Sequence, residues 1–319
     1  MRRLLHVLVG VILLGWAGLA LWFTVPWPVL AVAAFLALGG WAWWTRRWLV
    51  FGAAFLAVLA WFIALKPSHE RPWRDEVALM PRAFIEGDRV RLTGVRDFQY
   101  RSRNDFSVRY EEREVSLAHL TGVDFFLSYW TPGPVGHTFV SFLFDDAPPL
   151  SISIETRPEI TESFNPLASL FKQFELIYVV GSERDIVGVR TNHRKEDVYL
   201  YHTIASPDDA RRLLTIYLER VNQLADRAEF YHLLSNSCTI NIVRYVRAAS
   251  ATPIRFNIRH YLNGWFDAYL HGVGALSSSL PFEELRARSQ INEAAQAAGD
   301  GPDFSRRIRA SLPAIQATR

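Results

Sequence analysis

The sequence holds one cysteine, Cys238, among 319 residues. A lone cysteine cannot form an intramolecular disulfide, so no disulfide framework supports the fold. The sequence also lacks a His-Glu-x-x-His run, a Gly-x-Ser-x-Gly run and any spacing typical of zinc ligands. Its net charge of +3 is too small to indicate nucleic-acid binding. We therefore predict no metal, no other cofactor and no nucleic-acid partner.

Charged side chains are absent from residues 4–45. As one helix this stretch would be about 63 Å long, about twice the hydrocarbon core of a bilayer. Pro26 and Pro28 cannot lie inside a continuous helix and divide the stretch in two. A further uncharged run covers residues 48–65. We therefore predict a membrane anchor over residues 1–65, with three transmembrane helices at about 4–23, 28–44 and 48–65.

The positive charges of the anchor indicate its orientation. Arg2-Arg3 and Arg46-Arg47 lie at the same end of the first helical hairpin, whereas the Pro-Trp-Pro turn is uncharged. Cytoplasmic loops are enriched in Lys and Arg. We therefore predict a multi-pass protein of the bacterial inner membrane, in contact with the lipid bilayer, with a cytoplasmic N-terminus and a periplasmic C-terminal domain. A cleaved signal peptide ending near residues 18–20 is the alternative, and the next two spans would still anchor its product.

The pattern after the anchor changes from strands to helices. Residues 66–89 are rich in proline and charge and predict a linker. Segments rich in β-branched and aromatic residues predict strands at 90–100, 106–115, 123–130, 138–144, 150–155, 174–180, 185–191 and 198–204. Helical patterns follow at 206–228, 238–249, 256–271 and 282–298. We expect an α+β domain over residues 90–275, with helices on one face of an antiparallel sheet, and a helical or loosely ordered tail over 276–319.

Cys238 is expected at the N-terminus of a helix. Ser235, Asn236 and Ser237 precede it and can cap a helix, and an apolar periodic run follows it. Free N–H groups at this position would stabilise a thiolate and could hold an oxyanion, with Asn236, Ser237 and Thr239 as the cap and oxyanion residues. The alternative is a small buried side chain that helps the helix pack.

His137 is the histidine best placed to act as a base. It follows the Gly-rich residues 133–136 and precedes an apolar strand. If the next hairpin is symmetric about Asp146, His137 lies opposite Glu155, and the two can form the pair that orients a general base. A register slip of one residue would separate them. Otherwise His137 is a capped loop histidine and Glu155 pairs with Arg157.

Two other chemistries were weighed. Serine catalysis through Ser235 or Ser237 has no supporting motif, and a better nucleophile lies beside them. The remaining candidate metal ligands are scattered over separate expected strands and do not predict a metal site: His119, Asp124, His193 and His202.

Four segments resemble a known family. They are "DFFLSYWTPGPVGHTFVSF", "ISIETRPE", "FKQFELIYVVGSERDIVGVRTNHRKEDVYLY" and "NSCT". Over roughly residues 90–250 the chain resembles the Lnb N-terminal periplasmic domain family, bacterial proteins of undefined function. The family's marks, a histidine after a Gly-containing loop and an Asn-Cys-Thr-Thr run, fall on His137 and on residues 237–240. This sequence departs from the run at Ser237 and Ile240.

The order histidine, carboxylate, cysteine is also similar to that of circularly permuted papain-like thiol hydrolases, by analogy. Such relatives cut cell-wall peptides, other amides or acyl esters. The sequence therefore predicts a membrane-anchored thiol hydrolase that acts on an amide or ester bond of a cell-wall peptide, lipoprotein or lipid. Cys238 would be the nucleophile, His137 the base and Glu155 its orienting partner. An inactive papain-like binding or scaffold domain is the alternative, and the substrate and oligomeric state are left open.

Overall fold

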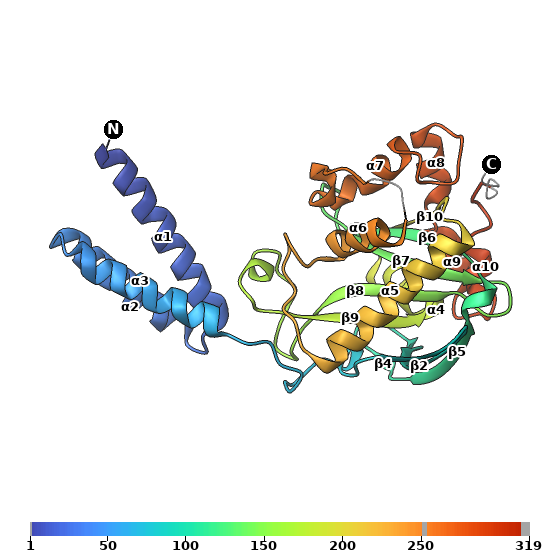
Figure 1. Ribbon diagram of the computed structural model, residues 1–319, viewed down its shortest axis with the longest axis horizontal. Helices are drawn as coiled ribbons and strands as arrows, with labels where there is room; N and C mark the ends of the chain where they lie inside the picture. Colours follow the sequence, from blue (N-terminus) through green and yellow to red (C-terminus); the bar gives the residue numbers. More distant parts are fainter. Residues whose placement is uncertain (1, 251–253, 314–319) are drawn as a thin grey trace.

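The computed structural model describes residues 2–250 and 254–313, and it has two parts (Figure 1). Three N-terminal helices lie to one side: α1 (Arg2–Thr24), α2 (Pro28–Trp44) and α3 (Trp48–Ala64). A domain built around one large sheet follows them. The helix ends fall within two residues of the predicted spans, because the proline pair and Arg46-Arg47 interrupt the helical pattern where expected.

Among the described residues, one helix is both long and apolar enough to cross a membrane, over the window Val7–Thr24. α2 and α3 are apolar but have 17 residues each. At about 1.5 Å per residue, 17 residues cover about 26 Å, less than the roughly 30 Å of a typical hydrocarbon core. The prediction of three helices is confirmed. Of the three, α1 is long enough to be a clear membrane span, whereas α2 and α3 are shorter.

The sheet contains eight strands: β1 (Arg82–Glu86), β2 (Arg89–Arg96), β5 (Tyr110–Ser116), β6 (Leu120–Tyr129), β7 (His137–Phe144), β8 (Leu150–Arg157), β9 (Glu175–Ser182) and β10 (Asp197–His202). Their order is β1-β2-β9-β8-β7-β6-β10, with β5 paired to β2, while β3 (Gln99–Tyr100) and β4 (Phe106–Ser107) form a separate ribbon. β2 joins β9 in parallel through Arg96 and Gly181, and the other pairings are antiparallel. The sheet is therefore mixed, which corrects the antiparallel prediction at this junction.

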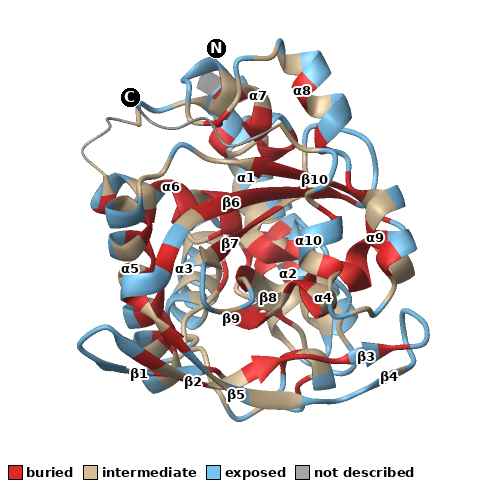
Figure 2. Ribbon diagram, turned by 90° about the vertical axis from the view of Figure 1, so that its right-hand side faces the viewer, coloured by how far each residue is buried: buried red, intermediate tan, exposed pale blue. Residues whose placement is uncertain are grey.

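Helices cover both faces of the sheet, not one face as predicted (Figure 2). α5 (Pro207–Asp226) and α6 (Cys238–Ala249) pack on one side, and α4 (Glu183–Ile186), α9 (Asn292–Ala298) and α10 (Phe304–Arg307) on the other. α7 (Phe266–Gly272) and α8 (Phe282–Ser289) lie toward the β10 edge. Neighbouring residues in one strand therefore enter different cores, as Phe125 and Phe126 do. Apolar runs such as those of β6 and β9 are typical of strands buried on both faces.

Three element predictions differ from the structure. Residues 185–191, expected as a strand, lie in α4 and a π-helical turn (Val189–Arg194), because Ser182 caps α4 by accepting a hydrogen bond from the Asp185 N–H at 3.2 Å. The expected linker contains β1, which pairs with β2. The tail after residue 276, expected to be helical or loosely ordered, is helical at α10 but not loose there, because Phe304 is buried against the sheet and completes the second core.

Candidate active site

Cys238 is the first residue of α6, as predicted. Ser237 occupies the N-cap position, and its carbonyl accepts a hydrogen bond from the Asn241 N–H at 3.0 Å. Its hydroxyl makes no capping bond, and the free N–H groups of the first turn stay near the thiol. Cys238 is 3% exposed, so this end of the helix is covered by other parts of the chain.

A buried tyrosine lies directly against the cysteine. The Tyr231 hydroxyl is hydrogen-bonded to the backbone N–H and the thiol of Cys238, and the Ser237 hydroxyl donates to it. Burial, and next the negative charge of Cys238, raise the pKa of Tyr231 well above its usual value. The phenol therefore stays protonated and can donate a hydrogen bond beside the sulfur.

The hairpin that carries His137 has the predicted register. Phe139 pairs with Ser153 and Phe142 with Leu150, a pattern symmetric about Asp146. Nε2 of His137 lies 3.8 Å from Oε1 of Glu155. Ser153 lies closer, with its Oγ 2.7 Å from the same nitrogen, and it also hydrogen-bonds Glu155. The serine hydroxyl therefore connects the imidazole to the carboxylate.

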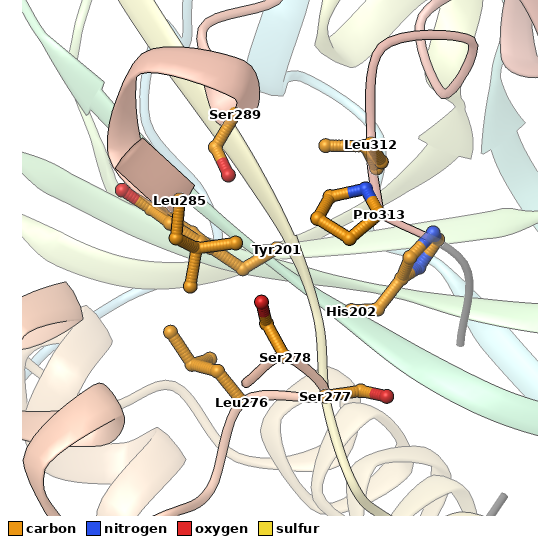
Figure 3. Close-up of a pocket in the computed structure, with 9 residues that line it drawn as sticks. All are labelled: Tyr201, His202, Leu276, Ser277, Ser278, Leu285, Ser289, Leu312 and Pro313. Atoms are coloured by element: carbon orange, nitrogen blue, oxygen red, sulfur yellow. The ribbon is translucent and has the colours of Figure 1, made fainter. Parts of the chain in front are cut away.

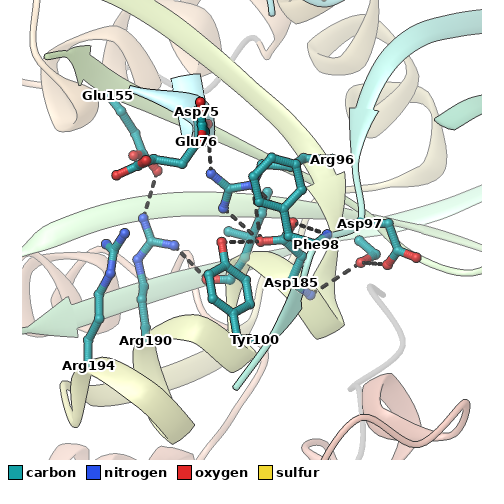
Figure 4. Close-up of polar contacts among 12 residues, drawn as sticks. Asp75, Glu76, Arg96, Asp97, Phe98, Tyr100, Glu155, Asp185, Arg190 and Arg194 are labelled. Atoms are coloured by element: carbon teal, nitrogen blue, oxygen red, sulfur yellow. Dashed lines mark hydrogen bonds and ion pairs between the residues drawn. The ribbon is translucent and has the colours of Figure 1, made fainter. Parts of the chain in front are cut away.

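Glu155 is fixed from behind by an arginine. Nη2 of Arg190 donates to its Oε1 at 2.7 Å, and the two side chains face each other in Figure 4. The Arg190 guanidinium also lies 4.9 Å from the ring centroid of Phe139, which stacks against His137. Burial alone raises the pKa of Glu155, but the charges of Arg190 and His137 outweigh it and hold that pKa well below its usual value. The carboxylate is therefore ionised at neutral pH.

The Cys238 sulfur is hydrogen-bonded to Nδ2 of Asn263, at 3.7 Å, and to Oγ1 of Thr239, at 3.8 Å. Because Nε2 of His137 faces Ser153, Nδ1 is the nitrogen left for the sulfur. Burial raises the pKa of Cys238, but the interactions of the thiol with the His137 imidazole and with Thr138 lower it from an ordinary 9.0 to about 6. This environment supports a thiolate at neutral pH.

Asn263 holds the loop before His137 in position. Its Oδ1 accepts from the Gly136 N–H at 2.9 Å, and its Nδ2 donates to the Gly136 carbonyl at 2.8 Å and to Thr239 Oγ1 at 3.0 Å. Gly264 lies so close to the loop that a Cβ would meet the Gly133 carbonyl at 2.4 Å. Thr239 also contacts Thr138 Oγ1 at 2.9 Å, which connects α6 to β7. The loop, the strand and the helix therefore meet at one point.

The other predicted site residues lie around this point but do not all face the sulfur. Asn236 donates to the Phe230 carbonyl at 3.0 Å and accepts from Asn241 at 3.0 Å, so it braces the loop before α6. Ser235, the alternative nucleophile, has its hydroxyl 3.0 Å from Nδ1 of His232. Glu155 and Arg157, the alternative ion pair, bind different partners.

The candidate metal ligands predicted from the sequence do not gather at one site. His119 pairs with Asp145 and Asp146 at an exposed turn, which is the one group of described residues with metal-like geometry. His202 binds Asp124, with 2.7 Å between Nδ1 and Oδ1. None of these residues contacts Cys238.

A small pocket with room for about one water molecule lies elsewhere, beside His202 and the segment after α7 (Figure 3). A second pocket of the same size lies beside Arg96 and Tyr110. Neither is lined by Cys238 or His137. The Cys238 thiol is buried, whereas the His137 side chain is 17% exposed.

Sequence reasoning missed several residues of the site, among them Ser153, Tyr231 and Asn263. For Ser153 a signal existed, because the register that pairs His137 with Glu155 places residue 153 on the same face one step closer to the turn. The Asn-Gly pair at 263–264 indicated a tight turn but not its partner. Nothing local to residue 231 indicated its contact with the cysteine.

Comparison with known proteins assigns a family. Residues 106–263 match the model of the Lnb N-terminal periplasmic domain, a range that begins at β4 and ends at Asn263. No curated protein and no solved structure matches the chain. The matched domain and the apolar helix Val7–Thr24 describe a membrane-anchored protein with a periplasmic domain. The chain belongs to the Lnb N-terminal periplasmic domain family.

Proposed function

We propose that this protein is a periplasmic thiol hydrolase, similar to circularly permuted papain-like enzymes, that acts on an amide or ester bond of an envelope substrate. The observation that carries the proposal is the position of Cys238 at a helix N-terminus beside the His137 imidazole, which lowers the thiol pKa to about 6. A buried cysteine that merely packs a helix has no need of an imidazole or of an ionised carboxylate behind that imidazole.

The first half of the reaction forms an acyl-enzyme. The Cys238 thiolate attacks the carbonyl carbon, a C–S bond forms, and the carbonyl electron pair moves to oxygen. The His137 imidazolium then protonates the leaving amine or alcohol as its bond to carbon breaks. In the second half, water attacks the thioester, His137 takes a proton from it, and the thiolate leaves.

The oxyanion is stabilised by donors at the start of α6. The backbone N–H of Cys238 and the protonated Tyr231 hydroxyl both lie at the sulfur. Ser153 and Glu155 orient the His137 ring and stabilise its charge. Asn263 and Thr239 keep the loop and the helix in register, and both also contact the Cys238 sulfur, at 3.7 and 3.8 Å.

Trapping the acyl-enzyme tests the proposal. We would incubate the full chain, in phospholipid nanodiscs, separately with cell-wall peptides, lipoproteins and phospholipids, and measure its intact mass. A substrate of one class should add an acyl group to Cys238 and not to Cys238→Ala. Turnover that persists in Cys238→Ala, or the absence of any adduct together with an unreactive thiol, would refute it.

One observation favours a second candidate, a catalytically inactive domain that binds a partner. Cys238 is 3% exposed, and neither pocket described above reaches it. A working enzyme must therefore open the loop at residues 131–136 or the segment around Asn263 to admit substrate. Protection of Cys238 from small alkylating reagents in the native protein would favour the binding domain.

We also propose that all three N-terminal helices cross the inner membrane, with the N-terminus in the cytoplasm. The Arg46-Arg47 turn and the N-terminal arginines would lie on the cytoplasmic side. In support, the indole nitrogen of Trp61 in α3 lies 3.4 Å from the Thr24 hydroxyl in α1, so both helices end on the side of the domain. Protease protection of tags placed at the N-terminus and at the C-terminus would test this arrangement.

A further inference from the structure

Exposed apolar side chains gather at the end of the sheet where β8 runs into β9. Ile160, Phe164 and Leu167 of the connecting loop are 64%, 47% and 43% exposed. Trp130 follows β6 and packs edge-on against Phe164, with ring centroids 5.9 Å apart. Leu234 is half exposed on a segment tied to the loop, because the Leu233 N–H donates to the Ser169 carbonyl. We call these five residues the apolar loop surface.

The same loop is attached to the membrane helices. Phe171 packs against Trp16, Phe23 and Phe62, with centroids 6.3, 5.9 and 6.3 Å apart. Trp16 and Phe23 belong to the apolar window Val7–Thr24. The helix rises about 12 Å between residues 16 and 24. Phe171 therefore reaches the level of the last two turns of the membrane-crossing helix.

Lys172 fixes the loop to the end of α3. Its Nζ donates to the carbonyl of Phe62 at 2.7 Å and lies 3.4 Å from those of Ile63 and Leu65. A cation at this position complements the negative end of the helix. Its backbone adopts a left-handed φ of 56°, which costs a non-glycine residue free energy. The loop is thus held at a defined height relative to the helices.

We propose that the apolar loop surface lies in the bilayer, in the interfacial region of the leaflet that receives the ends of α1 and α3. The loop projects toward the three helices (Figure 1), and its Phe171 and Lys172 attach it to the ends of α1 and α3 while its other apolar side chains stay exposed. Large clusters of exposed apolar side chains are uncommon on proteins that meet only water, and Trp favours the interface. This contact does not depend on the chemistry at Cys238.

Spin labels on single cysteines test the proposal. Cys238→Ala provides a background without cysteine, into which Ile160→Cys, Phe164→Cys and Leu167→Cys are introduced one at a time. The labelled full chain is reconstituted in nanodiscs of phosphatidylethanolamine and phosphatidylglycerol. Collision rates with oxygen, which concentrates in lipid, are compared with those of a water-soluble nickel complex. At least two of the three labels should have a higher collision rate with oxygen than with the nickel complex.

Ile204→Cys is the matched control. Ile204 is 44% exposed, a fraction similar to the 47% of Phe164. It follows β10 and lies at the end of the sheet opposite to Trp130, because His202 pairs with Asp124 near the start of β6. Its label should meet nickel more often than oxygen. Nickel-accessible labels at all three loop positions would overturn the proposal. Labels shielded from both reagents would overturn it too, because they would reveal a protein contact instead of lipid.

Discussion

Two imidazole–carboxylate pairs lie on the same sheet and differ in what faces them. His202 contacts Asp124 directly at 2.7 Å, and Arg309 backs that carboxylate at 2.9 Å. His137 reaches Glu155 through Ser153, and Arg190 backs Glu155 at 2.7 Å. The His202–Asp124 pair has the shorter contact, but only the His137–Glu155 pair has a thiol, that of Cys238, beside its imidazole. An oriented histidine is therefore common to both pairs, and a nucleophile at a helix N-terminus distinguishes the candidate site.

The largest expected difference between the two pairs is the effect of removing each imidazole on the pKa of Cys238. His137→Ala takes away the imidazole that lowers the thiol pKa, so the pKa of Cys238 should rise from about 6 to about 9 or higher. His202→Ala should leave it unchanged. The readout is the ultraviolet absorbance of the thiolate against pH, with Cys238→Ala as the blank. A similar pKa in both variants would mean that His137 does not stabilise the thiolate.

Neutralising each carboxylate should affect the stability of the fold in both pairs but the pKa of Cys238 in only one. Glu155→Gln should raise the pKa of Cys238 by about one to two units, because the imidazolium loses its counter-charge. Asp124→Asn should not. Each variant removes one carboxylate of a buried ion pair, but Arg309 keeps Glu183 and Arg190 keeps Glu196 as a partner, so the cost should stay below the roughly 3–5 kcal/mol of a fully broken pair. Chemical denaturation checks stability, and equal thiol pKa values in the two variants would contradict the assignment of Glu155.

Ser153→Ala tests the hydroxyl between imidazole and carboxylate. Losing one hydrogen bond of about 1 kcal/mol should raise the thiol pKa by about 0.7 units. Ser151→Ala is the matched control, since Ser151 lies on the same strand, is equally buried and binds Ser141 instead. An effect of the same size in the control would assign the change to packing of β8.

Gly264→Ala should have the smallest effect on the thiol. The added Cβ would lie 2.4 Å from the Gly133 carbonyl, so the loop before His137 must shift. Overpacking of this kind costs about 1–3 kcal/mol, and a displaced imidazole should raise the thiol pKa slightly. Gly272→Ala adds a Cβ with nothing within 4 Å and serves as the control. Equal stabilities of the two variants would contradict the close approach.

The parts of this structure that follow from local rules could be predicted from the sequence. The register of the β7–β8 hairpin is set by its short turn, and the start of α6 by the polar residues before it. These two features are enough to place His137 near Glu155 and Cys238 at a helix N-terminus. The side chains that contact them could not be predicted as easily, because Tyr231 and Asn263 are brought there by tertiary packing.

A buried charge explains why the strand predicted at residues 185–191 was wrong. Residues 185–191 have the composition of a strand, but Asp185 is fully buried in an ion pair with Arg96, with 2.8 Å between Nη2 and Oδ1 (Figure 4). That pairing depends on the parallel junction of β2 and β9, which no local pattern indicates. On the second face, α9 lies within the helical pattern predicted at 282–298, whereas α10 was not predicted because that part of the tail carries many charges and few apolar residues.

The pH titration of Cys238 in the unmodified protein tests the central claim most directly. Because the folded pKa of about 6 lies below the unfolded value, the ionised thiol stabilises the fold fully above about pH 9, and this contribution falls away as pH drops through 6. We predict a single thiolate absorbance step with its midpoint near pH 6. A midpoint near 9 would contradict the thiolate–imidazole pair.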